Sequence, residues 1–226
     1  MPVNTAKYKS IINELADKHA ILVAVSKTKP VEDIFELYNL GHRDFGENYV
    51  QELVDKSGSL PSDTRWHFIG HLQSNKVKYI APFVHLIHGV DSFKLLKEIN
   101  KQGEKAGRTI DCLLQVHIAE EETKFGFNEE ELILAMGQVN SLKIAHVRIC
   151  GLMGMASFTT DMNVVRTEFA HLKKIFDTAR TCLPLGQHPM DILSMGMSSD
   201  YKIALEEGSN IVRIGSLLFG EREKKS

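Results

Sequence analysis

The sequence is poor in the features that mark several classes of protein. Its three cysteines, Cys112, Cys150 and Cys182, are widely spaced, which predicts no disulfide framework and favours a reducing compartment. No apolar run approaches the roughly 18 residues of a membrane-spanning helix, and residues 1–20 lack the apolar core of a signal peptide. The net charge of -2 gives no electrostatic reason to expect nucleic acid or an anionic membrane surface as a partner. We therefore expect a cytoplasmic protein that binds neither.

The chain also lacks internal boundaries. No Pro/Gly/Ser-rich linker, low-complexity tract or repeat divides the 226 residues, so we expect one domain over 1–226. A composition of 43% hydrophobic and 25% charged residues is ordinary for a globular protein. No Gly-x-Gly-x-x-Gly turn follows the first apolar run, which argues against a doubly wound dinucleotide-binding fold.

Short apolar runs alternate with helical patterns along the chain, which is typical of parallel β/α units. A helix near the N-terminus is marked by Tyr8, Ile11, Ile12 and Leu15 on one face. The predicted strands are Ile21–Lys27, Asp44–Gly46, Trp66–Gly70, Leu86–Val90, Cys112–Ile118, Val147–Met153, Ile192–Met197 and Ile211–Ile214. Eight such units in this length predict a (β/α)8 barrel preceded by one extra helix.

A lysine, Lys27, closes the first predicted strand. Functional residues gather at the carboxyl ends of barrel strands, so Lys27 is well placed to reach the mouth of the barrel. Poor solvation there would favour the free amine, which can condense with a carbonyl. A solvated loop lysine is the ordinary alternative, and Lys29, just before Pro30, fits that alternative better.

A second signal, near the C-terminus, suits a phosphate group. Ser198 and Ser199 follow the seventh predicted strand, and Gly215 and Ser216 follow the eighth. Barrel enzymes often bind phosphate in these two loops, through hydroxyls, backbone amides and the start of a short helix. An amine able to form an imine and a phosphate pocket together suggest pyridoxal phosphate. Helix capping by Ser198 and a simple turn at Gly215 would explain part of the same pattern.

An arginine, Arg213, interrupts the apolar eighth strand. A buried guanidinium needs a carboxylate or a ligand acceptor as its partner, and a structural ion pair is the more common solution. The histidine pairs His67/His71 and His85/His88 bracket strand ends rather than helix faces, so we expect structural or pocket roles and no metal site.

Five segments make the chain resemble the pyridoxal phosphate homeostasis protein family. They are Ala24–Pro30 (AVSKTKP), Asp44–Glu52 (DFGENYVQE), Trp66–Lys76 (WHFIGHLQSNK), Leu193–Asp200 (LSMGMSSD) and Val212–Gly220 (VRIGSLLFG). The resemblance implies an α/β fold, a single TIM barrel of the alanine racemase N-terminal type (fold type III of pyridoxal phosphate proteins). It also implies pyridoxal 5'-phosphate held as a Schiff base on Lys27.

The resemblance assigns further cofactor-binding positions. Ser198, Gly215 and Ser216 match the phosphate side, whereas Ser199 stands where relatives often carry an acidic residue. Arg213 matches the arginine that faces the pyridine nitrogen, where it would leave the ring a weak electron sink. Asn48 and His71 resemble residues lining the pocket. On the seventh strand, Met195 or Met197 could pack against a cofactor ring.

Three functions remain open at this stage. The resemblance implies a non-catalytic protein of vitamin B6 and amino-acid homeostasis, which would hold pyridoxal phosphate and pass it to apo-enzymes that depend on it. A low-activity amino-acid racemase is the alternative, but the β-domain that supplies a second base in alanine racemases is missing from this sequence. A phosphate-sugar aldolase is less favoured, because its Schiff-base lysine usually lies on a later strand. Without that β-domain, we expect a monomer.

Overall fold

The computed structural model describes residues 3–119, 125–141, 144–182 and 189–220. Its strands are β1 (Ile21–Val25), β2 (Asp44–Glu47), β3 (Arg65–Phe68), β4 (Leu86–Val90), β5 (Ile110–Gln115), β6 (Val147–Met153), β7 (Ile192–Ser194) and β8 (Ile211–Ile214). Its α-helices are α1 (Thr5–Ala16), α2 (Val31–Asn39), α3 (Val50–Ser57), α4 (Val77–Ile80), α5 (Phe93–Ala106), α6 (Glu129–Ser141), α7 (Met162–Cys182), α8 (Tyr201–Glu206) and α9 (Ser216–Phe219). A short 3₁₀ helix, Ser74–Lys76, precedes α4.

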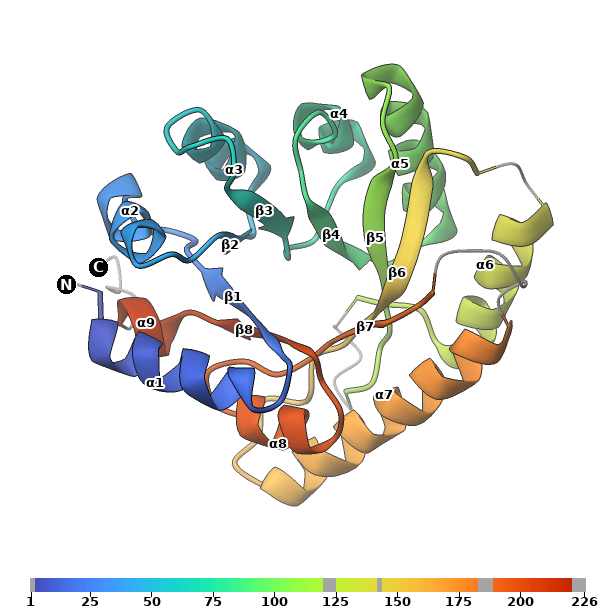
Figure 1. The fold of residues 1–226 in the computed structure, drawn as a ribbon. Coiled ribbons are helices and arrows are strands. Elements are labelled where there is room, and N and C mark those ends of the chain that lie inside the picture. The colour runs from blue at the N-terminus through green and yellow to red at the C-terminus, as the bar shows by residue number, and fades with distance from the viewer. Residues whose placement is uncertain (1–2, 120–124, 142–143, 183–188, 221–226) are drawn as a thin grey trace, which may run out of the picture.

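The eight strands form a closed parallel barrel in the order of the sequence. Pairing of β1 with β8, in which Leu22 lies opposite Val212, closes the ring. The helices surround the strands, and α1 packs beside α8 and α9 next to the closure (Figure 1). The backbone N–H of Asn4 donates to the carbonyl of Leu218 at 2.8 Å, which ties the start of α1 to α9. The predicted (β/α)8 barrel with an extra N-terminal helix is therefore confirmed.

Side-chain alternation along the strands divides the core into two layers. Residues such as Leu22, Phe45 and Phe68 point outward and pack under the helices in a large apolar layer. The apolar layer inside the barrel is much smaller, and its buried members are Val23, Leu86, Leu113, Cys150, Met153 and Ile211. The rest of the barrel interior has room for polar side chains.

Polar side chains and a glycine mark the ends of three helices. Ser92 accepts a hydrogen bond from the N–H of Leu95, and Gly107 ends α5 with a φ of 65°. Asn128 accepts from the N–H of Glu131 at 2.8 Å before α6. Before α7, Asp161 accepts a hydrogen bond from the N–H of Asn163 at 2.9 Å.

Four strands are shorter than predicted, and among them β3 spans Arg65–Phe68 in place of 66–70. Strand β1 ends at Val25, because the chain turns at Lys27 and Thr28. Strand β7 ends at Ser194, two residues before Gly196, whose φ of 93° diverts the chain. Strand β5 spans Ile110–Gln115 in place of 112–118. Among the described residues, no helix combines the length and apolar character needed to cross a bilayer.

Candidate functional site

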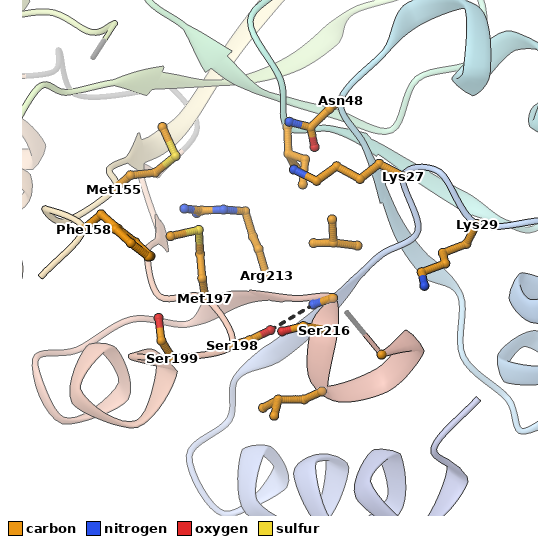
Figure 2. A pocket seen from close by; sticks show the side chains of 15 residues that line it. Lys27, Lys29, Asn48, Met155, Phe158, Met197, Ser198, Ser199, Arg213 and Ser216 are labelled. Atoms are coloured by element: carbon orange, nitrogen blue, oxygen red, sulfur yellow. Dashed lines mark hydrogen bonds between the residues drawn. The ribbon is translucent and has the colours of Figure 1, made fainter. Parts of the chain in front are cut away.

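A cavity of about 560 Å³ opens at the carboxyl ends of the strands, where the loops after β1, β2, β3, β6, β7 and β8 meet. Its lining consists of Val25, Lys27, Lys29, Asn48, Ile69, Met155, Phe158, Met197, Ser198, Ser199, Arg213, Gly215, Ser216, Leu217 and Gly220. Figure 2 shows Lys27 and Asn48 on one side of this pocket, the side chains of Met155, Phe158 and Met197 on the other, and Arg213 between them.

Lys27 lies in a turn, residues 26–29, rather than in strand β1 itself. The strand alternation nevertheless places it on the same side as Val23, which points into the barrel. Its side chain is half-buried. The next residue, Thr28, has a φ of 64°, a left-handed conformation that is costly for a β-branched residue. Such a turn holds its shape only where surrounding contacts fix it.

A buried group of charges supplies those contacts from behind the turn. In this carboxylate–lysine cluster, Lys56 donates to Glu47 at 2.8 Å and to Glu52 at 2.6 Å. Lys56 also donates to the carbonyl of Ser26 at 2.8 Å, and Glu52 accepts from the N–H of Thr28 at 2.5 Å. The backbone on both sides of Lys27 is thus held by helix α3.

The carboxylate of Glu47 is fully buried in this cluster. Burial raises the pKa of Glu47, although Lys56 and the hydroxyl of Ser26 oppose that change. Ser26 donates to Glu47 at 2.6 Å. The bonds from Ser26 and Lys56 both go to Oε1, and Oε2 has no hydrogen-bond partner among the described residues. The cluster is therefore sensitive to the loss of any one member.

The loops after β7 and β8 come together at the floor of the pocket, away from the turn that carries Lys27. The backbone N–H of Gly215 donates to the hydroxyl of Ser198 at 3.2 Å (Figure 2). Ser198 therefore joins the two loops instead of capping α8. A side chain at Gly215 would place its Cβ 3.2 Å from the carbonyl oxygen of Val25, so glycine permits this close approach. Helix α9 begins at Ser216 and directs its first N–H groups toward this end of the pocket.

Arg213 lies at the base of the pocket and is almost completely buried. It donates to the hydroxyl of Ser194 at 2.6 Å and to the carbonyls of Ser194 and Gly154 at 2.9 and 3.1 Å. Burial lowers the pKa of Arg213 to about 10, against the opposing charge of Asp200. The sequence favoured a structural ion pair, but among the described residues the guanidinium is held by a hydroxyl and two carbonyls instead.

The structure brings seven of the nine predicted residues to the pocket and leaves out Met195 and His71. Met195 is fully buried under the helices, because it keeps the outward direction of its neighbour Leu193. Met197 lines the pocket in its place, because the turn at Gly196 reverses the alternation. His71 bonds Asp91 at 2.9 Å, and its ring stacks on Phe125 with centroids 4.1 Å apart.

Several lining residues were not predicted, and most carry no distinctive sequence signal. Lys29 lines the pocket, but its ammonium group donates to the carbonyl of Phe219 at 2.7 Å at the end of α9. Met155 and Phe158 come from the loop after β6, where their positions depend on a chain path that no motif announces. Val25 and Ile69 could have been found from strand alternation. Val25 is the last residue of β1 and Ile69 is the first residue after β3, and both lie on the inward side of their strands, at the mouth of the barrel.

Comparison with known proteins decides the family. Residues 4–223 match the model of the alanine racemase N-terminal domain. The chain is 42% identical to the pyridoxal phosphate homeostasis protein of Aquifex aeolicus over 90% of this chain and 88% of that protein. It is 38% identical to the pyridoxal phosphate homeostasis protein of Pasteurella multocida over 89% of this chain and 86% of that protein.

The chain belongs to the pyridoxal phosphate homeostasis protein family. Among solved structures of this family's fold, PipY of Synechococcus elongatus with pyridoxal phosphate bound superposes with a TM-score of 0.86 at 33% identity. That alignment covers 95% of this chain and 99% of PipY. An alanine racemase from Streptomyces coelicolor, at 15% identity and a TM-score of 0.72, shares the fold over 96% of this chain and 58% of its own.

The pocket of this family member has the donors and acceptors that such a cofactor needs. The side-chain oxygen of Asn48 is buried and has no hydrogen-bond partner among the described residues. It lies on the Lys27 side of the cavity (Figure 2). A buried acceptor left without a donor costs free energy, which a bound ligand can recover. The residues present therefore fit pyridoxal phosphate.

Proposed function

We propose that this protein, as one domain over 1–226, binds pyridoxal phosphate in the pocket and holds it covalently through Lys27. The observation that carries the proposal is the shared cavity, which is lined both by Lys27 and by the paired loops of Ser198 and Gly215. A phosphate ester that carries an aldehyde would use both parts of this cavity, the amine for its aldehyde and the paired loops for its phosphate. When bound, the cofactor would supply an electrophilic aldehyde and a conjugated ring.

The phosphate end of the pocket is neutral and built largely from backbone and hydroxyl groups. Ser198 and Ser216 offer hydroxyl donors, and the start of α9 offers backbone N–H groups, whereas the hydroxyl of Ser199 donates to Asp200 at 3.3 Å. Because Gly215 already donates to Ser198, that hydroxyl is oriented with its own hydrogen available to a ligand. These groups would hold the phosphate by hydrogen bonds rather than by a cation.

The ring end of the pocket is set by Arg213 and Asn48. Arginine gives up its proton only with difficulty, so Arg213 would face the ring nitrogen as a donor and leave that nitrogen unprotonated. The unpartnered oxygen of Asn48 would accept a hydrogen bond on the Lys27 side. Met197 supplies an apolar surface beside the ring.

The same lining supports retention of the cofactor rather than turnover. Among the described residues that line the pocket there is no carboxylate, histidine, tyrosine or cysteine. A racemase needs an acid/base group on each face of the substrate carbon, and Lys27 supplies one. The mouth is open enough for release, since Phe158 at its rim is 96% exposed. We therefore infer a protein that holds pyridoxal phosphate and releases it to apo-enzymes.

The experiment that tests the site is borohydride reduction of the protein incubated with pyridoxal phosphate, followed by peptide mass spectrometry. We expect one reduced adduct, on Lys27, and none in Lys27→Ala. Lys29→Ala is the matched control, because Lys29 lines the same pocket two residues away and should be dispensable for the adduct. Full adduct yield in Lys27→Ala, or adducts spread over surface lysines, would overturn the assignment.

A second measurement separates retention from racemase activity. Alanine is incubated with the loaded protein in deuterium oxide, and exchange of its α-hydrogen is followed by NMR. We expect no exchange beyond that of free pyridoxal phosphate at the same concentration. Exchange that is faster with the protein and lost in Lys27→Ala would establish the racemase alternative instead.

A further inference from the structure

Polar side chains cross the barrel interior from one end to the other. The guanidinium of Arg213 donates to the hydroxyl of Ser194 at 2.6 Å, and this hydroxyl lies 3.0 Å from Nδ1 of His88. Nε2 of His88 lies 2.9 Å from Nδ1 of His67, and Nε2 of His67 lies 3.0 Å from the carboxylate of Asp44. Four consecutive hydrogen bonds therefore join the pocket to the amino-terminal end of β2.

The five residues of this hydrogen-bond chain come from five different strands, and all are buried. Asp44 is the first residue of β2, whereas Ser194 and Arg213 lie toward the carboxyl ends of β7 and β8. The alternation of side chains along each strand directs all five side chains into the barrel. Only the closed barrel brings them together.

The charges at the two ends restrict how the hydrogens are arranged. Arg213 can only donate. Although burial opposes it, the hydrogen bonds from Arg65 and His67 hold the pKa of Asp44 well below its usual range, so Asp44 accepts. Burial, together with the charge of Arg213, keeps the pKa of His88 well below its usual value, so His88 carries one N–H.

One arrangement satisfies both ends without another buried charge. Arg213 donates to Ser194, the Ser194 hydroxyl donates to His88, His88 donates to His67, and His67 donates to Asp44. Every donor then points away from the pocket, and each imidazole carries its hydrogen on Nε2. A carboxylate that selects one imidazole tautomer is a known means of orienting a group that acts further along a hydrogen-bond chain.

Two other roles fit the contacts less well. Proton conduction to the pocket would have to end on Arg213, which does not readily release a proton. A metal ion could use Asp44, His67 and His85, whose ligand atoms lie within 4.8 Å of one another. However, Arg65 already binds both oxygens of Asp44, and a cation would have to displace it. Orientation of Arg213 is the role that uses every bond of the chain.

We infer that Asp44, His67, His88 and Ser194 form a positioning relay that orients the guanidinium of Arg213 in the pocket from the opposite end of the barrel. Retention of a ligand that contacts Arg213 then depends on an aspartate that cannot touch it. This inference rests on the proposed function for the identity of the ligand, but the relay itself is a property of the protein without ligand.

The test compares two aspartates with the same partner chemistry. Asp44 at the start of β2 pairs through both oxygens with Arg65 on β3, and Asp111 near the start of β5 pairs in the same way with Arg148 on β6. Only Asp44 is bonded to a histidine of the relay. Asp44→Asn and Asp111→Asn therefore remove equivalent ion pairs, and only the first alters the relay.

The first readout uses the protein without cofactor. In ¹⁵N-histidine NMR spectra of the wild type, we expect His67 and His88 to be Nε2-protonated tautomers. Asn at position 44 accepts or donates, so Asp44→Asn should change the nitrogen shifts of His88, two bonds along the chain. Asp111→Asn should leave them unchanged. Unchanged His88 shifts in folded Asp44→Asn would overturn the relay whether or not the protein binds pyridoxal phosphate.

The second readout is the dissociation constant for pyridoxal phosphate, measured by equilibrium dialysis. We expect Asp44→Asn to weaken binding on the order of tenfold and Asp111→Asn to leave it within about twofold. Ser194→Ala, which cuts the chain beside Arg213, should weaken binding similarly, and the double variant no further. Additive losses would show independent effects and overturn the relay. If Asp44→Asn does not fold, Ser194→Ala is paired with His67→Gln in the same cycle.

A wild-type protein that fails to bind pyridoxal phosphate would overturn the proposed function and leave the NMR test of the relay intact. Wild-type binding with equal dissociation constants in Asp44→Asn and Asp111→Asn would overturn the relay and leave the proposed function intact. The two failures are therefore distinguishable.

Discussion

The two walls of the pocket are supported by different chemistry. Behind the Lys27 wall, on the outer face of the sheet, a lysine and two glutamates hold the backbone of the turn. Behind the Arg213 wall, inside the barrel, a hydroxyl and two imidazoles hold one side chain. The first support consists of ion pairs that share one lysine, and the second of a chain of hydrogen bonds between ends of opposite charge.

This difference has consequences for stability and for precision. Removing one member of a buried ion pair leaves an uncompensated charge, which costs several kcal/mol. Removing one link of a hydrogen-bond chain costs less, about 1 to 3 kcal/mol, but changes the orientation of everything beyond it. We therefore expect damage to the Lys27 wall to appear first as lost stability, and damage to the Arg213 wall first as lost affinity.

The largest expected effect is that of Lys56→Met. Without the ammonium group, the fully buried Glu47 loses its ionic partner and the carbonyl of Ser26 loses a donor. The free energy of unfolding, measured by urea denaturation, should fall by about 3 to 5 kcal/mol. Lys173→Met is the control, since Lys173 pairs with Asp177 at the same spacing on the exposed surface of α7. It should change stability by less than about 1 kcal/mol.

Equal small losses of unfolding free energy in Lys56→Met and Lys173→Met would break the comparison of the two walls. They would mean that the carboxylate–lysine cluster is solvated like an ion pair on the surface. A large loss of unfolding free energy in Lys56→Met, with normal affinity for pyridoxal phosphate in the protein that remains folded, would sharpen the comparison. The Lys27 wall would then be a stability element whose geometry survives without its charges.

Acid should affect the two walls with opposite signs. At the foot of the relay, His42 donates to the carbonyl of Asp44, and burial lowers the pKa of His42 to about 4. The unfolded chain takes up this proton near pH 6.5, so the stability due to neutral His42 is present above pH 6.5 and is lost toward pH 4. Burial also depresses the pKa of His88, which acts in the same direction.

Glu47 acts in the opposite direction. Its raised pKa means that the folded protein binds a proton more readily than the unfolded chain, so its contribution is favourable at low pH and is lost as the pH rises through the folded value. Between pH 6.5 and 5 we expect His42→Gln to flatten the fall in stability by about 2 kcal/mol. Glu47→Gln should make the free energy of unfolding fall more steeply as the pH is lowered toward the acid end of this range. Parallel curves for both variants and the wild type would contradict the assignment.

How far the sequence predicts this site depends on whether a residue follows the alternation of its strand. Lys27, Arg213 and Ser198 could be placed because strands ending in polar residues mark the mouth of a barrel. The prediction of Met195 as a pocket residue is wrong, and its alternative Met197 lines the pocket, because the left-handed turn at Gly196 decides between them. The sequence shows that a glycine is present at this position, but its backbone conformation cannot be predicted from the residue type alone.

The relay could not be predicted from the sequence for a different reason. His67 and His88 are 21 residues apart, and His88 and Ser194 are 106 apart. Their spacing along the chain carries no motif, and His67 was considered only beside His71, which lies elsewhere. The contact arises from strand order and register in the closed barrel, and those follow from the fold as a whole.

The smallest expected effect separates the turn from the cluster that holds it. Thr28 and His19 are non-glycine residues with positive φ, 64° and 51°, and His19 lies in the loop before β1, away from the pocket. Glycine at either position removes a cost of roughly 1 to 2 kcal/mol for the left-handed conformation and adds back about 0.5 to 1 kcal/mol of unfolded-state entropy. We expect both Thr28→Gly and His19→Gly to raise the free energy of unfolding by about 0.5 kcal/mol or to leave it unchanged.

The two glycine variants should differ in local opening, measured by amide hydrogen exchange. The N–H of Thr28 is held by Glu52, so exchange at this amide reports whether the turn keeps its shape. If the carboxylate–lysine cluster alone fixes the turn, Thr28→Gly leaves exchange at position 28 slow and the reduced Lys27 adduct at full yield. If the strained residue contributes, exchange accelerates and the yield falls, while His19→Gly changes neither. The second result is the one we expect, because a left-handed β-branched residue has few alternative conformations, and glycine has many.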